Sequence, residues 1–220
     1  MSGLFGPDTP QFWIPPSEAD DSGIVGAGGN LAPATMLRAY SEGVFAWFNE
    51  GDPILWWSPD PRAIFEIDQL NISRRLARTY RSGKFHITIN QAFSDVVAGC
   101  ANRDEGTWIT ESMIEAYQRL HRLGHAHSLE TWLHGQLVGG IYGVSIGGLF
   151  AGESMFHRAT DASKVALVAL MEHLVIRGYE LFDTQMVTTH TSSMGAIEIP
   201  RANYLARLTR AIQRDDVSFV

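Results

Sequence analysis

The chain has 220 residues, of which 45% are hydrophobic and 19% are charged, and its net charge at pH 7 is −7. This composition is ordinary for a folded soluble protein with ample core. The negative charge argues against bulk nucleic-acid binding, and the single cysteine, Cys100, excludes a disulfide framework and a cysteine-based metal site. No apolar stretch approaches the roughly 20 residues of a membrane span, and no signal peptide is recognisable, so we expect a cytoplasmic protein.

The N-terminal part combines irregular segments with an aromatic cluster. Residues 1–30 are rich in Gly, Pro, Asp and Ser, so we expect irregular structure with little packing of its own. Pro33 opens a predicted helix that ends near Gly43. The segment Ser58-Pro59-Asp60-Pro61 stiffens the exit from this region. We place a domain boundary there, which gives a small domain at residues 1–62 and a larger one at residues 63–220.

Four of the six tryptophans fall in this small region, at positions 13, 47, 56 and 57. Bulky rings could compensate for a small core. Alternatively, one or two rings could remain accessible and stack on a base, which is worth about 1–3 kcal/mol per base. The residues alone leave both interpretations open.

The larger region predicts strands that lead into one strand–helix–strand unit. We expect strands at 63–67, 85–89, 127–133, 137–144 and 149–156, and helices at about 91–100 and 111–123. A helix at about 161–177 and a strand at 179–187 follow. Such a short crossover joins parallel strands. The pattern therefore predicts a mixed α/β (α+β) sheet closed by this last strand.

A basic helix stands out between Asp68 and Asp95, where no acidic residue occurs. Ser73 can cap it, and it carries or precedes Arg74, Arg75, Arg78, Arg81 and Lys84. Three of these arginines share one helix face. The C-terminal helix repeats the pattern with Arg207, Arg210 and Arg214. Such a surface suits a limited phosphate contact with a compact RNA, although solvated helix faces are the alternative.

Polar side chains gather at the ends of the two parallel strands. Glu153 lies on the first strand, and Asp183 and Gln185 lie two residues apart on the second. A carboxylate in an apolar strand is costly unless it is paired or used in chemistry. Ligands of such sheets collect at this edge. We therefore expect a site that binds a cation or handles a proton, with structural pairing to Arg158, Lys164 or His190 as the alternative.

His121, His125 and His127 form a histidine cluster. Two of them are four residues apart, but Gly124 ends the predicted helix between them. We therefore expect no metal site.

The segment before the central helix excludes one common ligand. The strand order resembles that of GNAT acetyltransferases, which bind the pyrophosphate of acetyl-CoA on a glycine-rich loop. Here residues 157–163 contain no glycine, and Asp161 puts a negative charge where the phosphate would sit. Function must therefore be argued from the site rather than from the fold.

Several sequence runs are together specific to one family. The chain resembles the leucyl/phenylalanyl-tRNA–protein transferases. The matching runs are Gly28–Leu31, Gly51–Arg62, Glu105–Thr110, Leu123–Ser128, Ala151–Phe156, Phe182–Gln185 and Gly195–Arg201. The resemblance implies a small N-terminal domain beside a GNAT-like domain. It also implies transfer of Leu or Phe, and possibly Met, from aminoacyl-tRNA to proteins that begin with Arg or Lys, which marks them for N-end rule degradation.

The resemblance also assigns residues. It implies an apolar donor pocket made by Ile141, Phe150, Met155, Leu170, Leu174 and Phe182, and an adenosine site between Trp47 and Trp108. The basic helix would take the tRNA acceptor stem. Asp183 would help to remove the proton of the acceptor amine through Gln185, and Glu153 would hold the acceptor.

The resemblance implies no cofactor, and we expect a monomer. Two alternatives are a GNAT-type N-acetyltransferase and a non-catalytic RNA-binding module.

Overall fold

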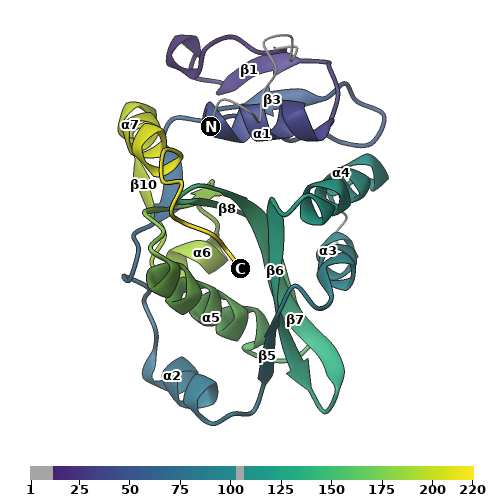
Figure 1. Cartoon of the computed structure of the whole chain (residues 1–220), viewed down its shortest axis with the longest axis vertical. Coiled ribbons are helices and arrows are strands. Elements are labelled where there is room, and N and C mark those ends of the chain that lie inside the picture. Colours follow the sequence, from purple (N-terminus) through teal and green to yellow (C-terminus); the bar gives the residue numbers. More distant parts are fainter. Residues whose placement is uncertain (1–11, 103–106) are drawn as a thin grey trace.

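Two sheets of unequal size organise the chain (Figure 1). The computed structural model describes residues 12–102 and 107–220. Within them a small antiparallel sheet has the strand order β1-β3-β2, and a larger one has the order β10-β4-β9-β8-β7-β6-β5. The strands of the small sheet are β1 (Ile24–Ala27), β2 (Phe45–Ala46) and β3 (Leu55–Trp57).

The larger sheet contains one parallel pair among its described strands. Its strands are β4 (Arg62–Phe65), β5 (His86–Ile89), β6 (Ala126–Leu133), β7 (Gln136–Ile146), β8 (Leu149–His157), β9 (Leu181–Gln185) and β10 (Ile197–Ile199). β8 and β9 run parallel, joined by the helix α5 (Ala162–Arg177), and the other pairs are antiparallel. The predicted mixed α/β fold and its parallel unit are therefore confirmed.

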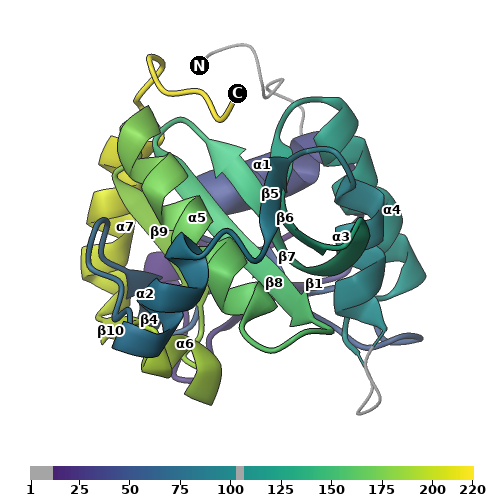
Figure 2. The same cartoon turned by 90° about the horizontal axis from the view of Figure 1, so that it is seen from below.

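Helices cover both faces of the larger sheet. They are α1 (Pro33–Ser41), α2 (Arg74–Arg81), α3 (Phe93–Ala101), α4 (Glu111–Arg122), α5, the short α6 (Thr189–Ser193) and α7 (Arg201–Ala211). Figure 2 shows α5 and α2 in front of the strands and α1 behind them. Side chains of α1, α3 and α4 share one hydrophobic cluster with β7 and β8, whereas α5 and α2 pack on the opposite face. No helix in the described ranges is long and apolar enough to cross a bilayer.

Local signals fix several helix ends, among them the predicted cap at Ser73 and the predicted end at Gly124. The Ser73 hydroxyl accepts a hydrogen bond from the backbone N–H of Leu76, and the Thr110 hydroxyl accepts one from Met113. Each therefore satisfies an N–H group that the first turn leaves unpaired. Gly124 follows α4 with a positive φ of 81°, which glycine adopts at little cost.

The expected lack of packing in residues 1–30 is wrong for the described part, from residue 12 onward, although the only elements there are a 3-10 turn at Pro16–Glu18 and the strand β1. β1 pairs with β3, and Trp13 is buried with its ring centroid 4.9 Å from that of Trp56. The Trp13 indole N–H donates to Glu42 at 2.7 Å. Composition did not predict this packing because it depends on partners tens of residues away. Residues 1–11 lie outside the described residues, as do residues 103–106, which include the start of the run Glu105–Thr110.

The prediction that the strand after α5 closes the sheet is also wrong. β9 has β4 on its other side, and β10 lies beyond β4. β4 is a predicted strand, but its neighbours come from the C-terminal third of the chain. The connection Ser58–Pro61 separates the two sheets, and one hydrophobic cluster spans both parts. The division into domains at residue 62 stays a prediction.

Candidate active site

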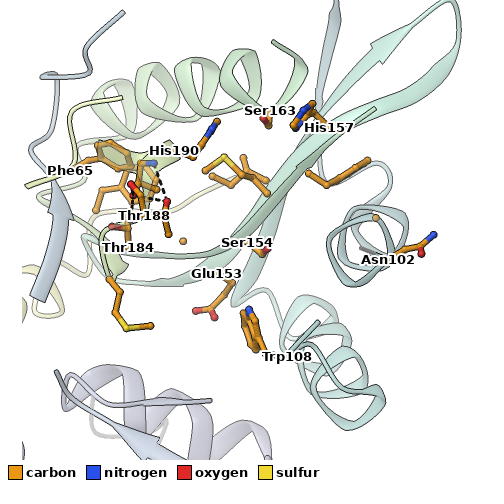
Figure 3. A pocket seen from close by; sticks show the side chains of 18 of the residues that line it. Phe65, Asn102, Trp108, Glu153, Ser154, His157, Ser163, Thr184, Thr188 and His190 are labelled. Carbon is orange, nitrogen blue, oxygen red and sulfur yellow. Dashed lines mark hydrogen bonds between the residues drawn. The ribbon is translucent and has the colours of Figure 1, made fainter. Parts of the chain in front are cut away.

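A cavity lies where the two parallel strands part. β8 and β9 pair only over Leu149–Ala151 and Leu181–Asp183, although β8 continues to His157. Beyond the paired residues lies a cavity of about 590 Å³. Its apolar lining includes Phe65, Trp108, Ile141, Met155, Phe156 and Phe182. Figure 3 shows Glu153 and Trp108 at one end of the cavity and Phe65, Thr188 and His190 towards the other.

A β-bulge directs Glu153. The register of β7 and β8 passes from Gly143 opposite Gly152 to Tyr142 opposite Ser154, which leaves Glu153 as an extra residue. In a regular strand Glu153 and Met155 would point to the same face. Here Glu153 reaches side chains of α1 and α4, whereas Met155 packs on the α5 side. Bulges often redirect a side chain in this way beside active sites.

Three uncharged donors surround the Glu153 carboxyl group. Its Oε1 accepts hydrogen bonds from the Tyr40 hydroxyl at 2.7 Å and from Gln185 Nε2 at 2.9 Å, and its Oε2 accepts one from the Tyr117 hydroxyl at 2.6 Å. Burial raises the pKa of Glu153 to about 7, even though the hydrogen bonds from Tyr117 and Tyr40 act to lower it. The group can therefore exchange a proton near neutral pH.

Asp183 has different surroundings although it lies on the adjacent strand. Its carboxylate is 1% exposed and is 2.6 Å from Nη2 of Arg62 in β4. It also accepts hydrogen bonds from the Tyr204 hydroxyl at 2.9 Å and from the backbone N–H of Gln185 at 2.8 Å. The predicted structural partners Arg158, Lys164 and His190 are therefore wrong, because the charge partner comes from β4.

Gln185 joins the two carboxylates by different groups. Its backbone N–H donates to Asp183, and its side chain donates to Glu153. The resemblance implies that Asp183 acts on the acceptor amine through Gln185, and this role stays a prediction; the side-chain amide of Gln185 contacts Glu153. This arrangement brings Glu153, Asp183 and Gln185 together, as the sequence predicted, but only Glu153 lines the cavity.

Comparisons with known proteins identify the family. Residues 64–209 match the model of the leucyl/phenylalanyl-tRNA protein transferase family, and residues 29–60 match that of its N-terminal domain. A leucyl/phenylalanyl-tRNA–protein transferase of Citrobacter koseri is 54% identical over 190 residues, which cover 86% of this chain and 81% of the relative. One of Escherichia coli O157:H7 is 52% identical over 192 residues, which cover 87% and 82%. The chain belongs to the leucyl/phenylalanyl-tRNA–protein transferase family. It is a tRNA-dependent aminoacyltransferase, so the acetyltransferase and the non-catalytic RNA-binding module are set aside.

Similarity to solved structures is weak. A ribosomal-protein-alanine N-acetyltransferase from Brucella melitensis is 16% identical, with a TM-score of 0.35 over 50% of this chain and 84% of its own. The L-PGS structure from Bacillus licheniformis is 14% identical, with a TM-score of 0.41 over 70% and 51%. At these scores the likeness carries no argument about function.

Of the six residues predicted to form the pocket for the donor side chain, three line the cavity. Ile141, Met155 and Phe182 line the cavity. The other three predicted residues, Phe150, Leu170 and Leu174, are 0% exposed and belong to the core beneath the sheet. They support the lining, as Phe150 does by contacting the ring of Phe182 edge-on with centroids 5.5 Å apart.

Four of the six tryptophans differ in burial in a way that bears on the site. Trp13 and Trp56 are buried against each other and fill the core. Trp47 and Trp108 are each partly exposed. Trp108 lines the cavity, whereas Trp47 lies outside the described lining and packs against Trp57 with ring centroids 5.4 Å apart. Of the two interpretations that the sequence leaves open, core filling therefore describes Trp13 and Trp56, and partial exposure describes Trp47 and Trp108.

The basic helix α2 keeps its charge on the surface. Arg74, Arg75, Arg78, Arg81 and Lys84 are all exposed. Arg75 donates to Asp161 at 2.8 Å, but Arg74, Arg78 and Arg81 have no carboxylate partner among the described residues. The C-terminal basic face is weaker than expected, because Arg207 pairs with Glu66, and Arg214 pairs with Glu180 and Asp216.

The histidine cluster has structural contacts. His121 stacks on Phe93 and His127 stacks on Phe219, with ring centroids 4.1 Å and 4.2 Å apart. Burial lowers the pKa of His127 to about 4. Within the described residues, no group of three or more His, Cys, Asp or Glu side chains is arranged to hold a metal ion.

Sequence reasoning missed four side chains that shape the site, namely Tyr40, Tyr117, Arg62 and Tyr204. Tyr40 and Tyr117 lie at apolar helix positions, so the pattern marks them only as core. Arg62 belongs to the specific Gly51–Arg62 run, and this was the only signal that could have singled it out.

Proposed function

We propose that this aminoacyltransferase moves Leu or Phe from aminoacyl-tRNA to the α-amino group of proteins that begin with Arg or Lys. The observation that carries the proposal is a cavity whose lining combines apolar side chains, among them Ile141, Met155 and Phe182, with one carboxyl group, Glu153. Of the described lining residues, Glu153 is the only acid. An apolar cavity suits the donor side chain, and a carboxyl group suits a cationic acceptor terminus.

The donor occupies the cavity and the surfaces beside it. Its side chain contacts Ile141, Met155 and Phe182, which line the cavity. The terminal adenosine is assigned to Trp47 and Trp108, which are both partly exposed, since aromatic rings stack on bases. The acceptor stem lies on α2, where Arg74, Arg78 and Arg81 supply positive charge without a competing carboxylate among the described residues.

The reaction needs a neutral amine. The acceptor's α-ammonium group gives up a proton, its nitrogen attacks the ester carbonyl carbon, and the bond from that carbon to the ribose oxygen of tRNA breaks as the amide forms. The nitrogen loses a second proton as the amide forms, and the ribose oxygen takes up a proton as it leaves. We assign proton acceptance to Glu153, since its pKa of about 7 suits this role and its carboxyl lines the cavity. Gln185 orients Glu153 through the hydrogen bond to Oε1.

The direct test mixes the protein with tRNA carrying labelled Phe and a peptide that begins with Arg. Label should appear on the Arg peptide and also on a Lys peptide. The same peptide with an acetylated α-amine should remain unlabelled, because it has no amine to attack. Absence of label on the Arg peptide, with folded protein and intact Phe-tRNA, would refute the proposal.

A matched pair of variants tests the cavity. Ile141→Phe adds bulk inside the cavity and should lower kcat/KM for Phe-tRNA about 10-fold or more, since overpacking typically costs about 1–3 kcal/mol. Ile176→Phe makes the same change at a side chain that is 81% exposed, and it should leave kcat/KM unchanged. Equal effects of the two variants would show that the donor does not occupy this cavity.

We also propose that the protein acts as a monomer in the cytoplasm, where aminoacyl-tRNA is made, and that the transfer marks its acceptors for N-end rule degradation. Size-exclusion chromatography should give the 24.3 kDa mass of one chain. Elution as a stable larger species would contradict the monomer.

A further inference from the structure

Arg62 is a buried cation whose guanidinium group is held by hydrogen bonds from all three of its nitrogens and by two aromatic rings. Its Nε donates to Asp183 Oδ1 at 2.9 Å and its Nη2 donates to Asp183 Oδ2 at 2.6 Å. Its Nη1 donates to the carbonyl of Gly43 at 3.0 Å. The rings of Tyr204 and Phe45 lie 4.4 Å and 4.9 Å from the guanidinium carbon. At 1% exposure, Arg62 cannot reach a substrate.

The partner carboxylate has no free position. Oδ1 of Asp183 accepts from Arg62 and from the backbone N–H of Gln185, and Oδ2 accepts from Arg62 and from the Tyr204 hydroxyl. A carboxylate offers about four lone-pair sites, and four donors occupy them here. Asp183 therefore has no open acceptor position that could take a proton from the acceptor amine.

The geometry of Gln185 depends on this carboxylate. Gln185 has a φ of +62°, a left-handed conformation that costs a non-glycine residue roughly 1 kcal/mol or more. The hydrogen bond from its backbone N–H to Asp183, at 2.8 Å, stabilises the conformation at the end of β9. From there the Gln185 side chain reaches Glu153 at 2.9 Å. A continuous path therefore runs from Arg62 through Asp183 and Gln185 to Glu153.

We propose that Arg62 is a positioning residue for the transfer reaction, which fixes Asp183 and, through Gln185, sets the position of Glu153 at the cavity. The proposal rests on the proposed function. It assigns Asp183 to positioning and not to proton transfer. The Arg62–Asp183 pair then affects the position of the Glu153 carboxyl group through Gln185, without touching it.

The test compares Arg62→Lys with Arg201→Lys. Lysine keeps the charge but cannot form the two parallel hydrogen bonds to Asp183. Arg201 is a suitable control because it is also buried, at 9% exposure, but it bonds the carbonyls of Ser58 and Ala19, away from Glu153. We expect Arg62→Lys to lower kcat about 10-fold or more with an unchanged KM for Phe-tRNA, and Arg201→Lys to leave the kcat of the folded protein unchanged.

The pH profile separates positioning from simple loss of folded protein. The hydrogen bond from Gln185 lowers the pKa of Glu153, so losing it should move the acidic limb of kcat to higher pH in Arg62→Lys. The limb should stay in place in Arg201→Lys. Arg62 is not a positioning residue if Arg62→Lys lowers the maximal kcat but leaves the acidic limb of the pH profile unmoved. The same holds if the variant retains the full kcat of wild type.

Two further measurements keep the proposal testable. Tyr204→Phe removes only the hydroxyl that bonds Asp183, and it should cause a change of the same kind and smaller size if Arg62→Lys does not fold. Titration of the Glu153 carboxyl carbon by NMR needs no activity, and its midpoint should rise in Arg62→Lys. Failure of wild-type transfer would refute the proposed function, whereas an unmoved NMR midpoint would refute only the role of Arg62.

Discussion

Asp183 and Glu153 lie on adjacent strands, yet the carboxylate of Asp183 is paired with a cation of the fold, whereas the carboxyl group of Glu153 is bonded only by uncharged donors. Asp183 faces a guanidinium group and is closed off from the cavity. Glu153 faces two tyrosine hydroxyls and an amide and borders the cavity. A carboxylate paired with a cation within the fold stabilises the fold only if the pair stays intact, whereas a carboxyl group surrounded by uncharged donors has no such cation and can pair with a ligand.

The largest expected effect comes from breaking the buried pair. Arg62→Ala leaves the buried carboxyl group of Asp183 without its cation, so the free energy of unfolding should fall by about 3–5 kcal/mol. Glu153→Gln should change it far less, because no ion pair is lost. Urea unfolding followed by tryptophan fluorescence measures both, with exposed Arg78→Ala as a control that should stay within about 0.5 kcal/mol of wild type. Similar losses at Arg62 and Glu153 would contradict the comparison.

Removal of the available charge should affect activity most. Glu153→Gln keeps the shape of the side chain but cannot attract a cationic acceptor or accept its proton. A hydrogen bond to a charged group is worth about 1.5–3 kcal/mol, so kcat/KM for the Arg peptide should fall about 10- to 100-fold. The Kd for Phe-tRNA should remain at the wild-type value. Steady-state transfer assays and filter binding measure the two quantities, and wild-type transfer by the variant would exclude Glu153 from the reaction.

The pH dependence of activity should follow Glu153. Its pKa is raised to about 7, so the carboxyl is protonated below that pH, and kcat/KM should fall about tenfold per pH unit under pH 7. Stability should run the other way. A raised folded-state pKa adds stability below the ordinary value of 4.5, and that stability is lost as pH rises through about 7. The melting temperature of Glu153→Gln relative to wild type should therefore rise between pH 5 and pH 8. A pH-independent difference would show that Glu153 does not titrate in this range.

Local chemistry explains the parts of the fold that the sequence predicts. Ser73 and Thr110 cap helices by contacts within three residues, and the apolar run of α5 between two strands specifies a parallel crossover. The same reasoning brings Glu153 and Asp183 onto neighbouring strands. Each of these signals needs only a short stretch of chain.

Long-range contacts explain the parts that it does not predict. The bulge at Glu153 depends on the register with β7, and the Arg62–Asp183 pair joins residues 121 positions apart. Tyr40 and Tyr117 approach Glu153 from two helices whose patterns mark them as core. The sequence could therefore place the carboxylates at one edge of the sheet, but it could not indicate that Asp183, and not Glu153, is paired with an arginine.

The smallest expected effect concerns the proposed tRNA surface on α2, which carries an arginine that pairs with a carboxylate and others that do not, among the described residues. Arg78 has no carboxylate partner among the described residues, whereas Arg75 donates to Asp161 at 2.8 Å. Each phosphate contact contributes about 0.9 to the slope of log K against log salt concentration for duplex nucleic acid. Arg78→Ala should therefore reduce the slope for Phe-tRNA binding by about 1, and Arg75→Ala should reduce it by less. Binding measured between 50 and 200 mM salt gives both slopes, with Arg207→Ala as a control because Arg207 pairs with Glu66. Equal slopes for wild type and Arg78→Ala would move the tRNA contact away from α2.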